Sequence, residues 1–142
     1  MTTPDIISPW SLLQEELQYD PWKVLIACKM LNLTNYKQVR KVIFNFFKKW
    51  PDPAHASQAK QEDMALMLKP LGFYNRRSKQ IIRFSKEYLE KKWNDPIELY
   101  GVGKYAADSY KIFILRSLDV EPTDKKLIRY VNWAKNRNCT TA

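Results

Sequence analysis

Two of the three glycines in the chain, Gly101 and Gly103, are separated by one residue, and a helical pattern follows them from Lys104. Glycine accepts positive φ, and its missing Cβ lets a large partner approach the backbone. The first amides of the helix at Lys104 have no intrahelical partner and point out of the turn, which suits an anion such as phosphate. The alternative is a tight corner between two helices that needs glycine only for its shape. With Lys104 directly after the turn, we favour phosphate binding by Gly101, Val102, Gly103 and Lys104.

Helical spacing of apolar residues along most of the sequence predicts an all-α fold with short connections. Residues 21–31 are apolar on nearly every side, as in a buried central helix. We expect amphipathic helices at 36–50 and 75–93, and further helices at 104–116 and 123–137.

Cap signals mark several of these starts: a Ser11-x-x-Gln14 capping box, Asp20-Pro21 and Asn35. The length of 142 residues suits one domain. We place this domain at residues 8–137, between a tail of residues 1–7 and a tail of residues 138–142.

The formal net charge of +9 favours a polyanionic partner over a surface that is basic only for solubility, because the charges gather beside the glycine turn. Cys28 and Cys139 lie far apart without metal-ligand spacing, which argues against a disulfide framework and a zinc site. No apolar run approaches ~18 residues, so we expect no membrane association. We also identify no signal peptide.

The segments Leu99-Tyr100-Gly101-Val102-Gly103-Lys104-Tyr105-Ala106-Ala107 and Asp124-Lys125-Lys126-Leu127-Ile128-Arg129 resemble the helix-hairpin-helix DNA glycosylase superfamily. Within it, the chain is most similar to the catalytic domain of the methyl-CpG-binding thymine/uracil mismatch glycosylases. The resemblance runs from about Ser8 to Trp133 through further segments in the same order, namely Leu12-Leu13-Gln14-Glu15, Asp20-Pro21-Trp22-Lys23, Leu31-Asn32, Leu68-Lys69-Pro70-Leu71-Gly72 and Pro96-Ile97-Glu98-Leu99. It implies a compact helical glycosylase fold with a helix-hairpin-helix motif.

The resemblance assigns Asp124 as the catalytic aspartate, although position alone favours an ordinary helix N-cap. Loss of a base develops positive charge on the sugar, which a carboxylate stabilises while it activates water. Tyr105 stands where relatives that also cut the DNA backbone carry a lysine. A phenol cannot form the Schiff base which that lysine forms, so we expect base removal without strand cleavage.

The resemblance also implies a base pocket that contains Gln14 and Lys126. An amide offers a donor and an acceptor to the edge of a pyrimidine, whereas an exposed helix glutamine is the alternative. Lys126 lies two residues after Asp124. It contacts a phosphate or the base pocket, and the alternative is a side chain that is only solvated.

For DNA contacts beyond the glycine turn, we expect Leu71 to act as a wedge in the base stack, with Arg76 and Lys79 on phosphates. The alternative places Leu71 in the core beside a solvated basic helix. Leu33 departs from the family pattern, which has an arginine that fills the hole left by the flipped base. Leucine fills space without hydrogen bonding, and this puts mismatch preference in doubt.

These features lead to the expectation of a monofunctional DNA glycosylase in base excision repair, which removes thymine or uracil opposite guanine from double-stranded DNA. The alternatives are a non-catalytic helix-hairpin-helix DNA-binding module and a mismatch adenine glycosylase. We expect no cofactor, because two cysteines cannot build the iron–sulfur cluster of some relatives. The resemblance allows a monovalent cation on the carbonyls of the turn. It further implies a monomer in the nucleus.

Overall fold

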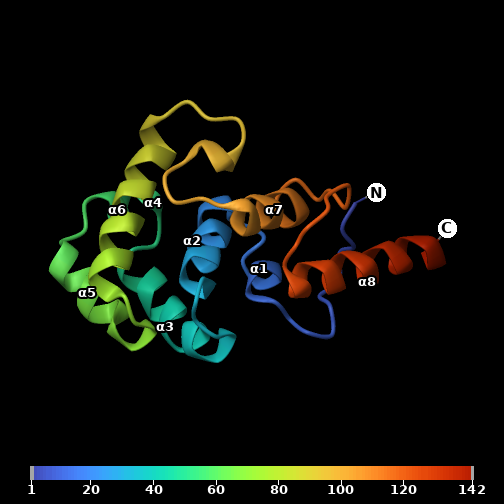
Figure 1. The fold of residues 1–142 in the computed structure, drawn as a ribbon, viewed down its shortest axis with the longest axis horizontal. Coiled ribbons are helices and arrows are strands. Elements are labelled where there is room, and N and C mark those ends of the chain that lie inside the picture. The colour runs from blue at the N-terminus through green and yellow to red at the C-terminus, as the bar shows by residue number, and fades with distance from the viewer. Residues whose placement is uncertain (1, 142) are drawn as a thin grey trace.

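The computed structural model describes residues 2–141, with the side chains of residues 138–141 left aside (Figure 1). The α-helices are α1 (Leu13–Glu16), α2 (Pro21–Leu31), α3 (Tyr36–Lys49), α4 (Pro53–Ser57), α5 (Gln61–Leu68), α6 (Tyr74–Glu90), α7 (Lys104–Phe113) and α8 (Lys125–Thr141). Two short 3-10 helices are η1 (Lys69–Leu71) and η2 (Pro96–Glu98). The all-α prediction is confirmed. No helix within residues 2–141 is long and apolar enough to span a membrane.

Helix α2 forms the centre of the fold, with α1, α3, α6 and α7 packed around it (Figure 1). Its start is set by Asp20, whose side chain accepts the Lys23 N–H at 3.2 Å, and by Pro21 in the first turn. The buried residues of α2 are Trp22, Val24, Leu25, Ile26, Ala27, Cys28 and Met30. Since each fully buried large aliphatic side chain contributes about 1.5–3 kcal/mol, the apolar sequence of α2 accounts for its enclosure.

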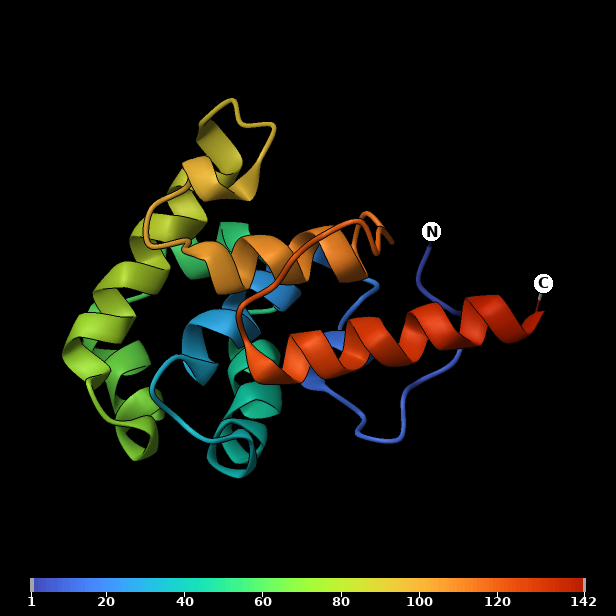
Figure 2. The ribbon, with the colours of Figure 1, turned by 45° about the vertical axis from the view of Figure 1, so that its right-hand side comes forward.

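The buried apolar residues form two clusters. The larger cluster surrounds α2 and includes Phe46 from α3 and Phe84 from α6. The smaller cluster joins α7 to α8, which run beside each other in Figure 2, and includes Phe113 and Tyr130. Tyr105, in the first turn of α7, packs against both clusters. The two clusters therefore meet at the start of α7.

The predicted Ser11–Gln14 capping box is wrong. Ser11 has φ 46°, and the cap is supplied by the buried carboxylate of Glu15, which accepts the N–H groups of Ser8 at 2.6 Å and Leu12 at 2.8 Å. Because Glu15 satisfies these donors, Gln14 is not needed at the cap and its side chain turns inward to Tyr105.

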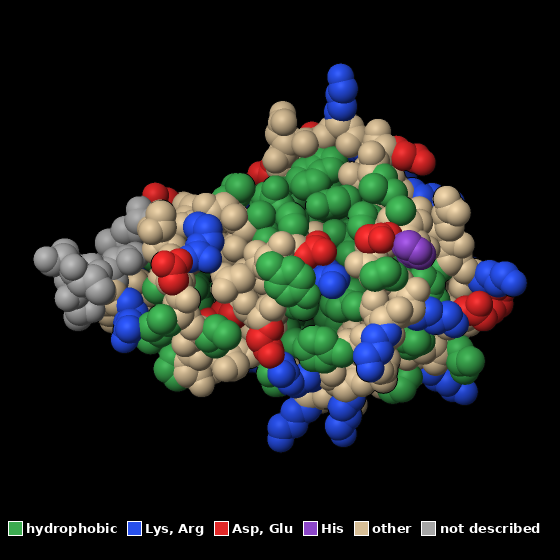
Figure 3. Space-filling view, turned by 180° about the vertical axis from the view of Figure 1, so that it is seen from behind, with side chains coloured by type: hydrophobic (Ala, Val, Ile, Leu, Met, Phe, Trp, Pro, Cys, Tyr) green, Lys and Arg blue, Asp and Glu red, His purple; other side chains and the backbone are tan. Residues whose placement is uncertain are grey.

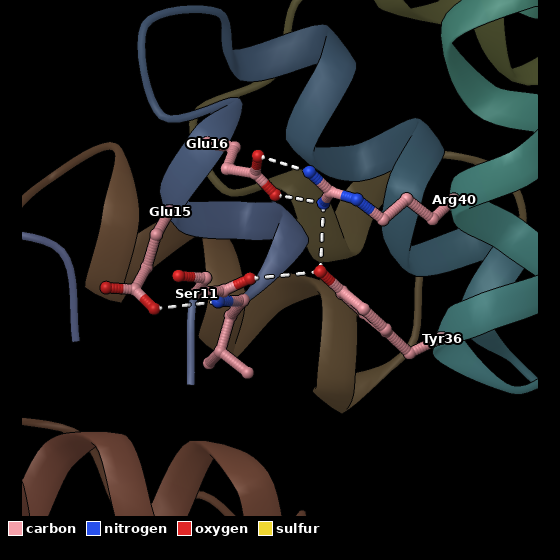
Figure 4. Close-up of polar contacts among 6 residues, drawn as sticks. Ser11, Glu15, Glu16, Tyr36 and Arg40 are labelled. Atoms are coloured by element: carbon pink, nitrogen blue, oxygen red, sulfur yellow. Dashed lines mark hydrogen bonds and ion pairs between the residues drawn. The ribbon is translucent and has the colours of Figure 1, made fainter. Parts of the chain in front are cut away.

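A polar network joins this N-terminal segment to α3 (Figure 4). Arg40 makes a two-pronged ion pair with Glu16 and donates to the Tyr36 hydroxyl at 2.9 Å. Tyr36 in turn donates to the Ser11 carbonyl at 3.3 Å. The network fixes the segment that carries Gln14 against the start of α3.

The ends of the chain differ from the expected tails. Within residues 1–7, the Thr3 N–H donates to the Arg116 carbonyl at 3.0 Å, and Thr3 is buried. The guanidinium of Arg116 also contacts the Thr3 carbonyl and pairs with Asp5. At the other end, α8 continues through the predicted tail of residues 138–142 as far as Thr141, and Ala142 lies outside the described residues.

A buried arginine, Arg77, connects the loop after α2 to the loop before α6. Its guanidinium donates to the backbone carbonyls of Lys29, Met30, Asn32 and Gly72 and to the Thr34 hydroxyl, over 2.6–3.0 Å. Burial lowers the pKa of Arg77, but the five contacts compensate its charge with dipoles.

We predict that Arg77→Met lowers the free energy of unfolding by about 3 kcal/mol, because it leaves several buried carbonyls without a donor. Urea denaturation monitored by circular dichroism measures this change. The control is Arg76→Met, at the neighbouring exposed position, with an expected change within about 0.5 kcal/mol. Equal effects of the two variants would contradict the assigned role of Arg77.

Candidate functional site

A cavity of about 470 Å³ opens where the two hydrophobic clusters meet. Its walls come from α1, from the loop between α2 and α3, and from the first turns of α7 and α8. It brings together four of the residues singled out in the sequence, Gln14, Tyr105, Asp124 and Lys126, together with Leu33.

Gln14 and Tyr105 form the inner wall of this cavity. The Gln14 amide donates to the Tyr105 hydroxyl at 2.7 Å and lies 3.5 Å from the Ser109 hydroxyl. Gln14 is 2% exposed, so the expected exposed-helix alternative does not apply. Burial, with the nearby Cys28 and Asp124, raises the pKa of Tyr105 far above its ordinary value. Its phenol therefore remains protonated and acts as a hydrogen-bonding group.

Cys28 lies behind the same wall, with its sulfur 3.9 Å from the Gln14 amide nitrogen. Burial raises the pKa of this thiol to about 12, so it is not a thiolate near neutral pH. Cys28 is a free cysteine, and the side chain of Cys139 lies outside the described residues.

Asp124 stands at the start of α8 with its side chain on the cavity. Its Oδ2 accepts the Leu127 N–H at 3.0 Å and its carbonyl accepts the Ile128 N–H at 2.9 Å, which is the geometry of an N-cap. Its second carboxylate oxygen, Oδ1, accepts no hydrogen bond from a described residue and is left for a partner in the cavity. The N-cap interpretation of Asp124 is confirmed, and the same side chain lines the cavity.

The glycine turn lies on the other side of Tyr105. Gly101 has φ 70°, whereas Gly103 is extended and begins α7 without any side-chain cap. The first backbone bond of α7 runs from the Ala107 N–H to the Gly103 carbonyl, so the earlier amides lack partners within the helix. Val102 is buried, and its N–H donates to the Leu99 carbonyl at 3.2 Å, so the donors of the turn without a partner in the helix begin at Gly103.

The side chain of Lys104 forms hydrogen bonds within the protein. Its ammonium donates to Asp108 at 2.8 Å and to the Glu121 carbonyl at 3.0 Å. These bonds tie the hairpin to the segment that leads to Asp124. The side chain of Lys104 is nevertheless 52% exposed, so its ammonium remains on the surface beside the turn.

The predicted wedge residue is wrong. Leu71 is 5% exposed because η1 turns its side chain into the larger cluster. The exposed apolar residue of this loop is Phe73, which is 61% exposed and held at φ 49°. The sequence contained a signal for this, since Gly72 relaxes the chain directly before Phe73.

Leu33 forms the matching projection on the neighbouring loop. It is 81% exposed and has φ 62°, a conformation that is uncommon for residues other than glycine. Leu33, Phe73 and Arg76 line one small cavity. Two apolar side chains in strained backbone positions thus stand beside a basic residue, next to the main cavity.

The remaining basic candidates lie on the surface. Arg76 and Lys79 are exposed on α6, as predicted. Lys126 is exposed at the rim of the main cavity, with its ammonium 6.0 Å from the centre of the Tyr36 ring. Seen from behind the view of Figure 1, the molecule has many apolar side chains across its middle, and most of the visible Lys and Arg side chains lie toward its edges (Figure 3). That face does not present a continuous basic surface.

Among the described residues, no group of three or more His, Cys, Asp or Glu side chains is arranged to hold a metal ion.

Comparison of the sequence with known proteins identifies the family of this chain. Residues 26–140 match the family described as "HhH-GPD superfamily base excision DNA repair protein", and the chain belongs to this superfamily. The chain is 43% identical to the methyl-CpG-binding domain protein 4-like protein of Arabidopsis thaliana over 131 residues, which cover 92% of this chain and 29% of that protein.

Two further relatives support the assignment of the fold. The chain is 31% identical to a thymine/uracil-DNA glycosylase of Pyrobaculum aerophilum, over 79% of this chain and 51% of that protein. A solved structure of a thermostable thymine-DNA glycosylase has the same fold, with a TM-score of 0.64 and 23% identity over 68% of this chain and 48% of that one. The chain therefore spans about half or less of each of these relatives.

We predict that Asp124→Ala lowers the free energy of unfolding by about 1 kcal/mol, whereas Asp124→Asn changes it by a few tenths, since asparagine caps as well as aspartate. Thermal or urea denaturation of the two variants measures the difference. A loss of equal size in both variants would show that the negative charge, and not the cap, stabilises the start of α8.

Proposed function

We propose that this chain is a monofunctional DNA glycosylase domain that hydrolyses the bond between deoxyribose and uracil or thymine opposite guanine in double-stranded DNA. One observation carries the proposal: the Asp124 carboxylate shares a cavity with the Gln14 and Tyr105 side chains, directly beside the glycine turn. The relatives named as thymine or thymine/uracil glycosylases support this choice of bases. Action as a monomer in the nucleus is part of the proposal.

In this proposal, the amides of the glycine turn bind a phosphate of the duplex, and the target nucleotide rotates out of the stack. The base enters the cavity against Gln14. The Gln14 amide nitrogen donates a hydrogen bond to the Tyr105 hydroxyl. The amide oxygen of Gln14 accepts no hydrogen bond from a described residue and is available to a pyrimidine N–H. The hydroxyl of Tyr105 thereby sets the orientation in which Gln14 meets the base.

Asp124 supplies the charge for the chemical step. As the bond between C1′ and the base breaks, its electron pair leaves with the base and positive charge develops on the sugar. The carboxylate stabilises that charge and accepts a proton from the water that attacks C1′. The departing base takes up a proton, and an abasic site remains.

The chemistry of Tyr105 supports the proposal that the domain does not cleave the DNA strand. A lyase reaction needs an amine that attacks C1′ and forms a Schiff base. Tyr105 offers a phenol at this position, and its raised pKa keeps the phenol neutral. The product of the reaction is therefore an abasic site in an intact strand.

Leu33 and Phe73 are suited to occupy the space left by the rotated nucleotide, because both are exposed apolar side chains near the cavity. Neither forms hydrogen bonds with the orphaned base. Extruding a base from the duplex costs a few kcal/mol, and this cost is smallest for a mispaired base. Preference for mismatches would then arise from this lower cost.

The test incubates the wild-type domain and Asp124→Asn with duplexes that contain G·U, G·T, G·A or A·T pairs, and cleaves abasic sites with alkali. The wild type should give strand breaks after alkali on G·U and G·T duplexes alone. Asp124→Asn keeps the helix cap but lacks the negative charge, so its rate should fall at least about 100-fold with unchanged duplex affinity. Intact wild-type strands after alkali would refute the enzyme and leave a DNA-binding module. Breaks before alkali would refute the monofunctional part, and excision of adenine would assign another base.

We predict that Phe73→Ala lowers the excision rate on G·T duplexes about tenfold or more, since base extrusion loses an apolar wedge. Single-turnover kinetics measures the rate. Leu66→Ala is the matched control, because Leu66 is also an exposed apolar residue, at 71%, but lies on α5. A similar decrease in both variants would exclude a specific role for Phe73.

A further inference from the structure

The residue before the glycine turn, Tyr100, has both backbone polar groups held by charged side chains of opposite sign. Its N–H donates to the Glu87 carboxylate at 3.0 Å, and its carbonyl accepts from the Lys29 ammonium at 3.0 Å. Glu87 belongs to α6 and Lys29 to the central helix α2. Two helices that are distant in sequence thus each hold one of the two peptide groups that flank the Tyr100 Cα, directly before Gly101.

The aromatic ring of Tyr100 is held as well. The guanidinium of Arg83 lies 3.8 Å from the ring centre, and its Nε is 3.4 Å from the second carboxylate oxygen of Glu87. Arg83 therefore contacts the ring and also orients the carboxylate that binds the N–H. These three side chains, Lys29, Glu87 and Arg83, are named here the Tyr100 clamp.

Lys29 is enclosed on both sides. Its ammonium lies 4.4 Å from the centre of the Phe84 ring. On the other side, a Cβ added to Gly101 would stand 2.8 Å from the Lys29 nitrogen. The ammonium fits beneath the turn because position 101 is glycine. It also lines a cavity of about 300 Å³ with Gly101, Gly103 and Gln80.

We propose that Lys29 and Glu87 are positioning residues which hold the Gly101–Gly103 turn in the conformation that binds the DNA backbone. Glu87 accepts the Tyr100 N–H and Lys29 donates to the Tyr100 carbonyl, so the two successive peptide planes that lead into the turn are both restrained. The role in DNA binding rests on the proposed function, whereas the restraint of the turn does not. Lys29 acts through the backbone, and not on the reacting atoms.

The burial of Lys29 gives the clamp a pH dependence. Desolvation lowers the pKa of Lys29 to about 8, against a smaller opposing effect of the Glu87 carboxylate. Further charged or titratable groups nearby are Arg83, beyond Glu87, and Lys104 and Tyr105 across the cavity. Arg76 and Arg77 line a second small cavity together with Lys29. As the pH rises through 8, the ammonium becomes neutral and its bond to the Tyr100 carbonyl weakens.

The effect of Lys29 on global stability has the opposite sign. Because its folded pKa of about 8 lies below its unfolded value of 10.5, the unfolded chain binds more protons between these pH values. Stability from this group therefore rises with pH in that window. A loss of DNA affinity near pH 8 would thus not reflect unfolding.

The experiment compares the wild type with Lys29→Met, which keeps the length of the side chain without its charge. The control is Lys23→Met on the same helix, whose ammonium also lies over an aromatic ring, 5.0 Å from the centre of Phe47. Fluorescence anisotropy measures affinity for a duplex with an abasic-site analogue between pH 6.5 and 9. Hydrogen exchange measures protection of the Tyr100 amide without DNA.

We expect Lys29→Met to bind the duplex about tenfold more weakly at pH 7 and to lose the decrease centred near pH 8, which the wild type and Lys23→Met retain. The Tyr100 amide should exchange at least about tenfold faster in Lys29→Met alone. Unchanged exchange would overturn the clamp, even if the domain binds no DNA. Faster exchange with unchanged affinity would overturn its role in DNA binding. Binding of the analogue duplex, combined with no excision in the alkali assay on G·U and G·T duplexes, would refute only the proposed function.

Discussion

The burial of α2 is the constraint on which the rest of the molecule depends. A helix that is apolar on nearly every side has to be covered all round, and four other helices pack on it for this reason. Its C-terminal end then emerges beside the glycine turn and the cavity. The loop after α2 carries Leu33, and Cys28 on α2 lies behind the wall formed by Gln14. The interior of the fold thus decides where the site can form.

Much of the fold follows from local signals in the sequence. Asp20 and Asn35 cap the helices that the sequence predicted, and Pro51-Asp52-Pro53 restarts a short helix with Asp52 as its cap. These signals are reliable because each depends on a few neighbouring residues. The cap by Glu15 could not be predicted, since its carboxylate reaches back seven residues to Ser8.

The same limit applies to the site. Membership of the glycosylase superfamily indicated Gln14, Tyr105 and Asp124, and the structure brings them to one cavity. The choice between Leu71 and Phe73 depended on which side chain the core needed, and that is a property of tertiary packing. Arg77 lies in sequence among the basic residues at the start of α6, but its side chain points inward and donates to the carbonyls of Lys29 and Met30 at the end of α2. Such demands have no local sequence pattern.

The inward position of Arg77 has a mechanical consequence. The Arg77 guanidinium donates to carbonyls of both loops that carry the exposed apolar residues Leu33 and Phe73. The two loops are therefore connected to each other through one side chain. If Leu33 and Phe73 enter a duplex together, the hydrogen bonds of Arg77 oppose a separation of the two loops. In the complex that we propose, unstacking and bending would then fall mainly on the nucleic acid.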